Sequence, residues 1–95
     1  MTDETEIISE LYEVIEDRRD NPRKDSYTSE LMKNENEILE KLGEETTETI
    51  IAAKDDEKDE VIHESADIIY HLFVLLASKE VELEEILDEL GERRN

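Results

Sequence analysis

The sequence predicts an all-α fold, a small helical bundle that is completed by association with further copies of the same chain. Apolar residues recur at helical spacing in four stretches, and no stretch alternates between apolar and polar residues as a half-buried strand does. Two glycines and one proline leave these stretches nearly free of helix breakers. A chain of 95 residues forms one domain, residues 1–95, whose thin core favours oligomers that bury more apolar surface.

The first helix is expected over residues 4–19. Its apolar side chains follow the three- and four-residue spacing of an amphipathic helix, and they are Ile7, Ile8, Leu11, Tyr12, Val14 and Ile15. The helix should end before Pro22, because the residue that precedes a proline avoids helical dihedral angles.

A loop and a short turn are expected to follow this helix. Residues 20–27 form the loop, and Ser26 or Thr28 is a suitable N-cap for a turn that reaches Met32. Asn34 and its neighbours then interrupt the apolar pattern before the next helix begins.

Three further helices are expected in the second part of the chain. The helix over residues 35–54 has one apolar arc, which is made of Ile38, Leu39, Leu42, Thr46, Thr49, Ile50 and Ala53. The helix over residues 56–78 is apolar nearly all round from residue 68 to residue 77, which is typical of a central helix at a subunit interface. The last helix, over residues 83–93, has its apolar side chains on one face, and these are Leu83, Ile86, Leu87 and Leu90.

The charge of the chain excludes several function classes. Thirty acidic and eleven basic residues give a formal net charge of −19, whereas nucleic acids and anionic membrane surfaces attract basic proteins. The longest uncharged run, Ile68–Ser78, is shorter than the about 20 apolar residues that span a bilayer. The acidic N-terminus is unlike a signal peptide, so we expect a cytoplasmic protein with no nucleic-acid or membrane partner. The chain has no cysteine, which excludes thiol catalysis and thiolate zinc sites.

The acidic pattern Glu44-Glu45-x-x-Glu48, followed by Glu64-x-x-Asp67, indicates a metal site. Acidic residues three apart share a helix face, and two such pairs on facing helices can enclose a divalent cation. Carboxylate oxygens suit Mg²⁺ or Mn²⁺. Ordinary surface acids are the alternative, and they have to be considered because nearly a third of the residues are acidic.

Helix phase separates this pattern from a chance match. At about 100° per residue, Glu45 falls within the apolar arc of its helix, about 20° from Ile38, and Glu48 lies at the margin. On the next helix one stripe borders apolar residues, and it is made of Glu64, Asp67 and His71. A second match to the same spacing lies instead in a connection and on polar faces, namely Asp55-Asp56-x-x-Asp59 with Glu82-x-x-Glu85. A carboxylate on a core-facing stripe is costly unless a cation pairs with it, so the first match is the stronger candidate.

The few basic residues are also informative. Four of them fall within seven residues, at the end of the first helix and in the loop after it, and they are Arg18, Arg19, Arg23 and Lys24. In so acidic a chain this cluster is a candidate phosphate clamp, and favourable placement of cations near a helix C-terminus is the alternative. Lys41, four residues before Glu45, is either a phosphate contact or an ordinary helix ion pair.

The histidines and aromatic residues divide between the site and the core. His71 continues the acidic stripe, so it is a candidate to contact a ligand or to support one, whereas His63 falls on the outer part of its helix and is expected to be solvated. Tyr27 could stack on a nucleotide base or cover the core, and Tyr12 and Phe73 are expected within the core. The chain has no glycine-rich phosphate loop and no nucleophile motif, so any catalysis must be assisted by a metal ion.

Taken together, these segments resemble the phosphoribosyl-ATP pyrophosphatases of histidine biosynthesis, an all-α family within the MazG-like superfamily of nucleoside triphosphate pyrophosphohydrolases. The acidic motif is typical of the whole superfamily, whereas the Ser-Tyr-Thr loop, the Ala-Ala-Lys segment and the Tyr-His pair indicate this family. The resemblance covers about residues 7–92, and it rests on Arg18-Arg19 before Pro22, Ser26-Tyr27-Thr28, Lys41-x-Gly43-Glu44-Glu45-x-x-Glu48, Ala52-Ala53-Lys54 and Glu64-x-x-Asp67-x-x-Tyr70-His71-Leu72. Asn34 stands where members often carry glycine, and it is expected to sustain the turn because asparagine tolerates left-handed dihedral angles.

The resemblance implies a MazG-like bundle and Mg²⁺-dependent hydrolysis of phosphoribosyl-ATP to phosphoribosyl-AMP and pyrophosphate. By position, the metal ligands are expected to be Glu45, Glu48, Glu64 and Asp67. Glu44 is expected to support them or to accept the proton of the attacking water. The substrate is expected to contact Arg18, Arg19, Arg23, Lys24, Ser26, Tyr27, Lys41, Lys54 and His71.

Two other functions are consistent with parts of the pattern. A house-cleaning pyrophosphatase of the same superfamily would act on aberrant or free nucleoside triphosphates, and the Ser26-Tyr27-Thr28 loop and His71 argue against it. A non-catalytic helical oligomerisation module would have no saturable Mg²⁺ site and would release no pyrophosphate. The acids outside the site are expected to form a solvated coat, of the kind that a salt-rich cytoplasm favours because salt screens their repulsion.

Overall fold

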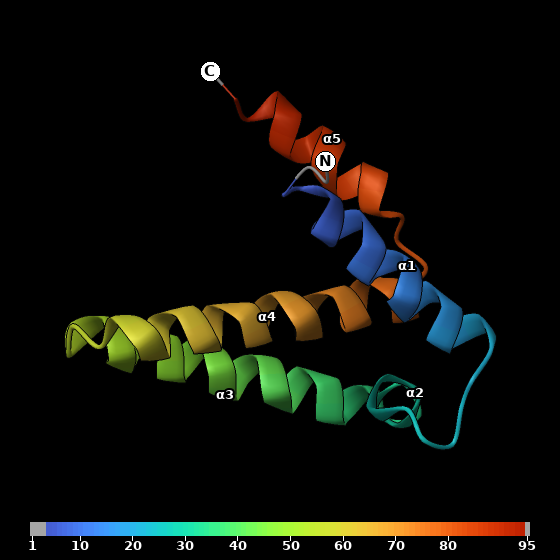
Figure 1. Ribbon diagram of the computed structural model, residues 1–95, viewed down its shortest axis with the longest axis horizontal. Coiled ribbons are helices and arrows are strands. Elements are labelled where there is room, and N and C mark those ends of the chain that lie inside the picture. The colour runs from blue at the N-terminus through green and yellow to red at the C-terminus, as the bar shows by residue number, and fades with distance from the viewer. Residues whose placement is uncertain (1–3, 95) are drawn as a thin grey trace.

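The computed structural model describes residues 4–94, which form a set of α-helices joined by short connections (Figure 1). The helices are α1 (Glu6–Asp20), α2 (Tyr27–Leu31), α3 (Glu35–Lys54), α4 (Lys58–Ser78) and α5 (Leu83–Glu92). No strand occurs between residues 4 and 94, so the predicted all-α class is confirmed. The predicted bounds of α3 are confirmed, whereas α1 and α4 begin two residues later than predicted, α1 ends one residue later and α5 ends one residue earlier.

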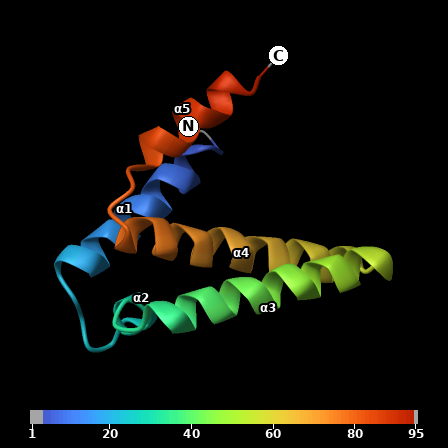
Figure 2. The same cartoon turned by 180° about the vertical axis from the view of Figure 1, so that it is seen from behind.

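Helices α3 and α4 form a long antiparallel hairpin and pack against each other along its length (Figures 1 and 2). Helix α1 contacts α4, and the short α2 packs against both α1 and α3. The beginning of α5 lies against α1, and the two line a shared pocket. The far half of the hairpin, which includes the α3–α4 connection, extends away from α1, α2 and α5 (Figure 2).

The core lies where α1, α2 and α3 meet the C-terminal half of α4. Its buried side chains are Tyr12, Ile15, Leu31, Ile38, Phe73, Val74, Ala77 and Leu83. The rings of Tyr12 and Phe73, both predicted in the core, pack edge to face with their centroids 5.2 Å apart. The Tyr12 hydroxyl donates a hydrogen bond to the Val81 carbonyl oxygen at 2.5 Å, which ties α1 to the connection before α5.

Side-chain caps begin two of the helices. Ser26 caps α2, as predicted, because its hydroxyl accepts a hydrogen bond from the Ser29 backbone N–H at 3.1 Å. The left-handed conformation expected of Asn34 is wrong, since its φ of −140° is extended. Its side-chain oxygen instead accepts a hydrogen bond from the Asn36 backbone N–H at 3.1 Å, so Asn34 is the N-cap of α3.

Left-handed backbone occurs just after the C-terminal ends of α3 and α4. Asp56 follows α3 with a φ of 55°, and Glu80 follows α4 with a φ of 58°. The Val81 backbone N–H donates to the Leu76 carbonyl oxygen at 2.9 Å, which is the hydrogen bond of a Schellman motif. An equivalent hydrogen bond closes the end of α3. Both helices therefore end in a turn that usually takes glycine.

The apolar arc predicted for α3 divides into two faces. The buried face contains Ile38, Glu45 and Ala52. The rest of the arc is largely exposed, at Leu39, Thr46, Ile50 and Ala53. On α4 a second group of apolar side chains is 39–58% exposed, and these are Ile62, Ile69 and Leu72. Each helix therefore carries more apolar surface than its neighbours within residues 4–94 cover.

Helix α4 is, by length and composition alone, long and apolar enough to cross a membrane. However, Glu64 and His71 are buried within the hairpin, and Val74 and Ala77 belong to the core. These are the contacts of a central bundle helix, so this one apolar helix does not indicate a membrane protein.

Candidate active site

Two acidic side chains are buried in the part of the chain that the structure describes. Glu45 on α3 is 9% exposed and Glu64 on α4 is 7% exposed. Both belong to the predicted metal-binding set. The acids of the second match to the motif spacing are all exposed, and they are Asp55, Asp56, Asp59, Glu82 and Glu85. Helix phase therefore identifies Glu45 and Glu64 as buried, whereas Glu48 of the predicted set is exposed like the acids of the second match.

One oxygen of the Glu64 carboxyl group is buried without a hydrogen-bond partner among the described residues. This oxygen is the Oε2 atom. The pKa of Glu64 is raised, chiefly because burial disfavours the charged form and also because Glu48 and Asp67 lie close by. A cation bound among these acids would offset both effects.

The side chains that could bind a metal in this part of the hairpin suit a divalent cation. One ligand atom from each of His63, Glu64 and Asp67 lies within 4.8 Å of the others. Glu48 is exposed, and together with Glu64 it lines a pocket of about 200 Å³ between α3 and α4. The unpaired, buried oxygen of Glu64 and its carboxylate neighbours fit a hard cation such as Mg²⁺. The structure thus brings Glu48, Glu64 and Asp67 together, as the motif predicts.

His63 is a further possible metal ligand, which the sequence did not identify as a site residue. Its side chain is 66% exposed, which confirms the prediction that it is solvated. Its Nε2 atom nevertheless lies 3.4 Å from Oδ2 of Asp67. The signal that could have identified it is the spacing of four residues, which puts His63 and Asp67 on one helix face.

Glu45 is held by a buried histidine. Its Oε1 atom accepts a hydrogen bond from Nδ1 of His71 at 2.7 Å, and both side chains are nearly inaccessible to solvent. The same nitrogen lies 3.0 Å from the Asp67 carbonyl oxygen. Since both neighbours of Nδ1 accept hydrogen bonds, this nitrogen carries a proton. His71 therefore supports a predicted metal ligand, one of the two roles that the sequence suggests for it.

Tyrosine side chains connect His71 to the short helix α2. The Tyr27 hydroxyl lies 3.3 Å from Nε2 of His71, within hydrogen-bonding distance. The Tyr27 ring stacks on that of Tyr70, with the centroids 6.3 Å apart, and the Tyr70 hydroxyl is hydrogen-bonded to the Thr28 hydroxyl. Tyr27 is also half-exposed, so its ring borders the site and covers part of the hairpin.

The arginine cluster is paired with acids of its own segment. Arg18 contacts Asp17 at 2.6 Å, Arg19 contacts Asp20 at 2.8 Å and Arg23 contacts Asp25 at 3.2 Å, each through side chains. Arg18 and Arg19 lie in the last turn of α1, where the alternative of favourable placement near the helix C-terminus puts them. Nη1 of Arg19 also donates to the Ala77 carbonyl oxygen at 3.0 Å, so this side chain joins the end of α1 to the end of α4.

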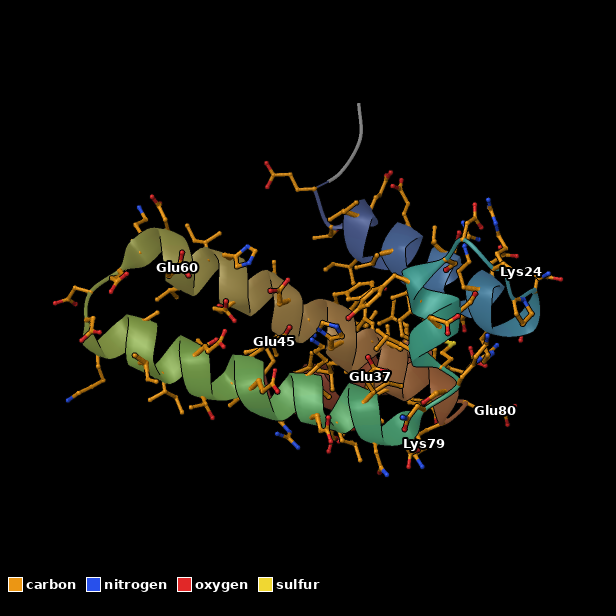
Figure 3. The ribbon with its side chains drawn as sticks, turned by 90° about the horizontal axis from the view of Figure 1, so that it is seen from below. Lys24, Glu37, Glu45, Glu60, Lys79 and Glu80 are labelled. Atoms are coloured by element: carbon orange, nitrogen blue, oxygen red, sulfur yellow. The ribbon has the colours of Figure 1, made fainter. Side chains whose placement is uncertain are left out.

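The basic cluster lies far from the acidic site within one chain. Arg18, Arg19 and Ser78 line a pocket of about 270 Å³. Ser78 follows Glu64 by 14 residues on α4, which is about 21 Å at 1.5 Å per residue. Figure 3 shows the same separation, with Glu45 between the hairpin helices and Lys24 at the far end of the molecule. The structure does not bring these two groups together.

The remaining predicted site residues are distributed along α2 and α3. Glu44 and Lys54 are exposed on α3, and Lys24 is exposed in the loop before α2. Lys41 lies close enough to Tyr27 for its charge to lower the pKa of the phenol in part, although burial causes a net rise. The Ser26 hydroxyl is engaged as the cap of α2. Contact of these side chains with a substrate stays a prediction.

Comparison with known proteins identifies the family. The model of the family described as phosphoribosyl-ATP pyrophosphohydrolase matches residues 8–94. A relative from Haloarcula marismortui, named phosphoribosyl-ATP pyrophosphatase, is 56% identical over 98 residues, covering 99% of this chain and all of the relative. Proteins of the same name from Clostridium acetobutylicum and Halobacterium salinarum are 54% and 47% identical, covering 96% and 92% of this chain and 84% and 96% of their own. The chain therefore belongs to the phosphoribosyl-ATP pyrophosphohydrolase family.

Proposed function

We propose that this chain hydrolyses phosphoribosyl-ATP to phosphoribosyl-AMP and pyrophosphate, the second step of histidine biosynthesis, in a Mg²⁺-dependent reaction in the cytoplasm. The observation that carries the proposal is its similarity to phosphoribosyl-ATP pyrophosphatases along nearly the whole chain. The burial of Glu45 and Glu64 supports it, because these are the motif acids that a polyphosphate hydrolase would use to hold a cation.

Four carboxylates are proposed to hold the cation, which is Mg²⁺ or Mn²⁺, and they are Glu45, Glu48, Glu64 and Asp67. Bound Mg²⁺ would polarise the phosphoanhydride and stabilise the charge that develops on the pyrophosphate leaving group. His71 orients Glu45 through the hydrogen bond at its Nδ1 atom. Glu44, exposed beside Glu45, is proposed to accept a proton from the attacking water or to support the ligands.

The basic residues are proposed to hold the phosphates in two groups. Lys41 lies beside Tyr27 at the border of the acidic site, so both side chains are proposed to contact the triphosphate of the substrate bound there. The basic cluster at the end of α1 lies about 20 Å away along α4, which favours a contact across a subunit boundary.

A second copy of the chain is the proposed partner. The exposed apolar side chains of α3 and α4 lie on the same hairpin as the acids, and the exposed fraction reaches 60% at Ile50 and 58% at Ile62. Apolar side chains gathered on one hairpin are costly to leave in water, and packing them against a second copy would extend the thin core of this 95-residue chain. A homodimer or a higher homo-oligomer follows.

The test is an assay of pyrophosphate release from phosphoribosyl-ATP, with ATP and deoxynucleoside triphosphates assayed in parallel. We expect turnover of phosphoribosyl-ATP with Mg²⁺ and little turnover without it. Glu48→Gln and Asp67→Asn should each abolish the reaction with little loss of helix content. Asp59→Asn is the matched control, because Asp59 is an exposed acid at the start of the same helix as Asp67.

The alternatives give different results in this assay. Preference for free nucleoside triphosphates would indicate a house-cleaning pyrophosphatase, and no pyrophosphate release from any substrate would indicate a non-catalytic oligomerisation module. Turnover retained in both Glu48→Gln and Asp67→Asn would contradict the assignment of the acidic site.

A further inference from the structure

His63 stands beside the two ligands of the hairpin that come from its own helix. One donor atom from each of His63, Glu64 and Asp67 falls within 4.8 Å of the others. The Nε2 atom of the imidazole is the one that approaches Asp67, at 3.4 Å from Oδ2. Nε2 lies at the tip of the ring, so it can reach a cation held by Asp67 without any change in the helix.

An ordinary ion pair between His63 and Asp67 would account for their contact but not for Glu64. Glu64 is more than nine-tenths buried, belongs to the same group of three donors and keeps an Oε2 atom without a hydrogen bond within residues 4–94. Burial of such an oxygen is costly unless a ligand occupies the space beside it. A ligand that all three side chains could share is a cation.

We propose that His63 adds an imidazole nitrogen to the acidic site and thereby makes it a site for first-row transition-metal ions as well as for Mg²⁺. Imidazole binds ions such as Co²⁺, Ni²⁺ and Zn²⁺ well, whereas Mg²⁺ strongly prefers oxygen. The proposal rests on the proposed metal dependence of this chain, and it extends it by a ligand of a different chemical class.

The exposure of His63 determines which metal ions bind more tightly because of the imidazole. Because 66% of the side chain is in contact with solvent, the imidazole can turn away from the site when Mg²⁺ is bound with water as its remaining ligand. A transition-metal ion replaces one of those waters by Nε2. Removal of the imidazole should therefore weaken the binding of transition-metal ions and leave the affinity for Mg²⁺ nearly unchanged.

The experiment measures the binding of two probe ions, Mg²⁺ and Co²⁺, to the full chain by calorimetry in a buffer that does not coordinate metals. We expect His63→Gln to raise the Kd for Co²⁺ about tenfold and to change that for Mg²⁺ less than about twofold. His63→Ala, which leaves no donor at all, should have the same effect on Co²⁺. Lys58→Gln is the control, because Lys58 is exposed on the same helix and outside the donor group.

A second readout detects the nitrogen directly. Co²⁺ is paramagnetic, so a coordinated imidazole gives a strongly shifted N–H proton resonance, and we expect one in the unchanged protein that disappears in His63→Gln. Equal Kd values for Co²⁺ in the unchanged protein and His63→Gln would overturn the role of His63 and leave the proposed function intact. Failure of the unchanged protein to bind either ion would overturn the proposed metal dependence itself.

Discussion

Glu64 illustrates how its surroundings decide the chemistry of one side chain. The chain has 30 acidic residues, and most are solvated, whereas the carboxyl group of Glu64 is enclosed between α3 and α4 beside Glu48 and Asp67. Because its pKa is raised, the metal-free fold holds a proton on this group more tightly than the unfolded chain does. Proton and cation therefore compete for the same oxygen atoms.

The raised pKa of Glu64 gives a prediction about pH. A carboxyl group with a higher pKa in the folded state than in the unfolded state stabilises the fold fully below the unfolded pKa. This contribution is lost as the pH rises through the folded pKa. In EDTA, we expect the Tm to fall between about pH 4.5 and neutral pH, and more steeply than for Glu64→Gln.

Thermal unfolding followed by circular dichroism over this pH range checks the difference between the two proteins. Comparison with Glu64→Gln isolates this group from the general repulsion among the acids, which both proteins share. Parallel curves for the two proteins would refute the role assigned to Glu64. Added Mg²⁺ should raise the Tm of the unchanged protein at neutral pH more than that of the variant.

The buried pair of Glu45 and His71 gives a second prediction at this scale. We expect His71→Leu to destabilise the metal-free protein by about 3 kcal/mol, because it leaves the Glu45 carboxylate buried without its partner. The double variant Glu45→Met/His71→Leu should recover most of that loss, since apolar side chains fill the same space without a charge. Urea denaturation measures both free energies of unfolding. A double variant as unstable as His71→Leu would show that the loss comes from packing alone.

Among the secondary-structure elements, the ends of α3 and α4 depart from the usual choice of residues. Each helix is followed by an acidic residue in the left-handed conformation, Asp56 or Glu80, where glycine is the common choice. An acid there also faces the negative end of the helix dipole. Both ends are therefore less stable than the turn geometry allows.

Replacement of Glu80 should relieve this strain. We expect Glu80→Gly to stabilise the protein by about 1 kcal/mol, because glycine adopts a left-handed backbone without steric cost and carries no charge. Glu80→Ala is the matched control, because it removes the charge and keeps the steric cost. The two variants should differ in their urea midpoints, with Glu80→Gly the more stable, and equal midpoints would mean that backbone conformation contributes nothing.

The bounds of the helices follow mostly from local properties of the sequence. Helical spacing and the Ser26 cap locate the helices to within two residues, because periodicity and capping are local properties. The Schellman turns at Asp56 and Glu80 escape prediction because their residues are not glycine. The division of the α3 arc into a buried and an exposed face is not predicted either. The width of the buried face depends on how α4 packs against α3, and the sequence of α3 alone does not show this.

The candidate site was predictable to a similar extent. The helix phase of Glu45 and Glu64 identifies them as buried because each lies on a face that the hairpin covers. The link from His71 to Glu45 joins residues 26 positions apart, and the Tyr27 contact spans 44 positions. Such contacts depend on how the helices pack, so no local spacing predicts them. The distance of the arginine cluster from the acids has the same origin.

At the scale of the whole molecule, charge repulsion opposes compactness. The net charge is −19, and few of the acids have a basic partner among the described side chains. Dissolved salt shortens the range of the repulsion, from about 10 Å at 0.1 M to about 3 Å at 1 M. Salt should therefore favour the folded chain and its association with a second copy.

This repulsion predicts a strong dependence of stability on salt. We expect the Tm to rise steadily with NaCl up to about 1 M, and helicity to be incomplete in salt-free buffer. The variant Glu10→Gln/Glu13→Gln/Glu40→Gln removes three exposed acids, which takes the net charge from −19 to −16. Its Tm should rise less with salt than that of the unchanged protein. Full helicity and activity without salt would contradict this account of the acidic surface.

The division between buried and solvated acids has a consequence for how such a sequence can change over generations. Substitutions among the solvated acids outside the site alter the surface field by small steps, because no single side chain there has a defined partner in the proposed chemistry. Single substitutions of Glu45 and Glu64 are more costly, since each carboxyl group is buried and Glu45 is hydrogen-bonded to His71. Adaptation to a different salinity can therefore change the surface acids of this protein while the acids of the proposed site stay the same.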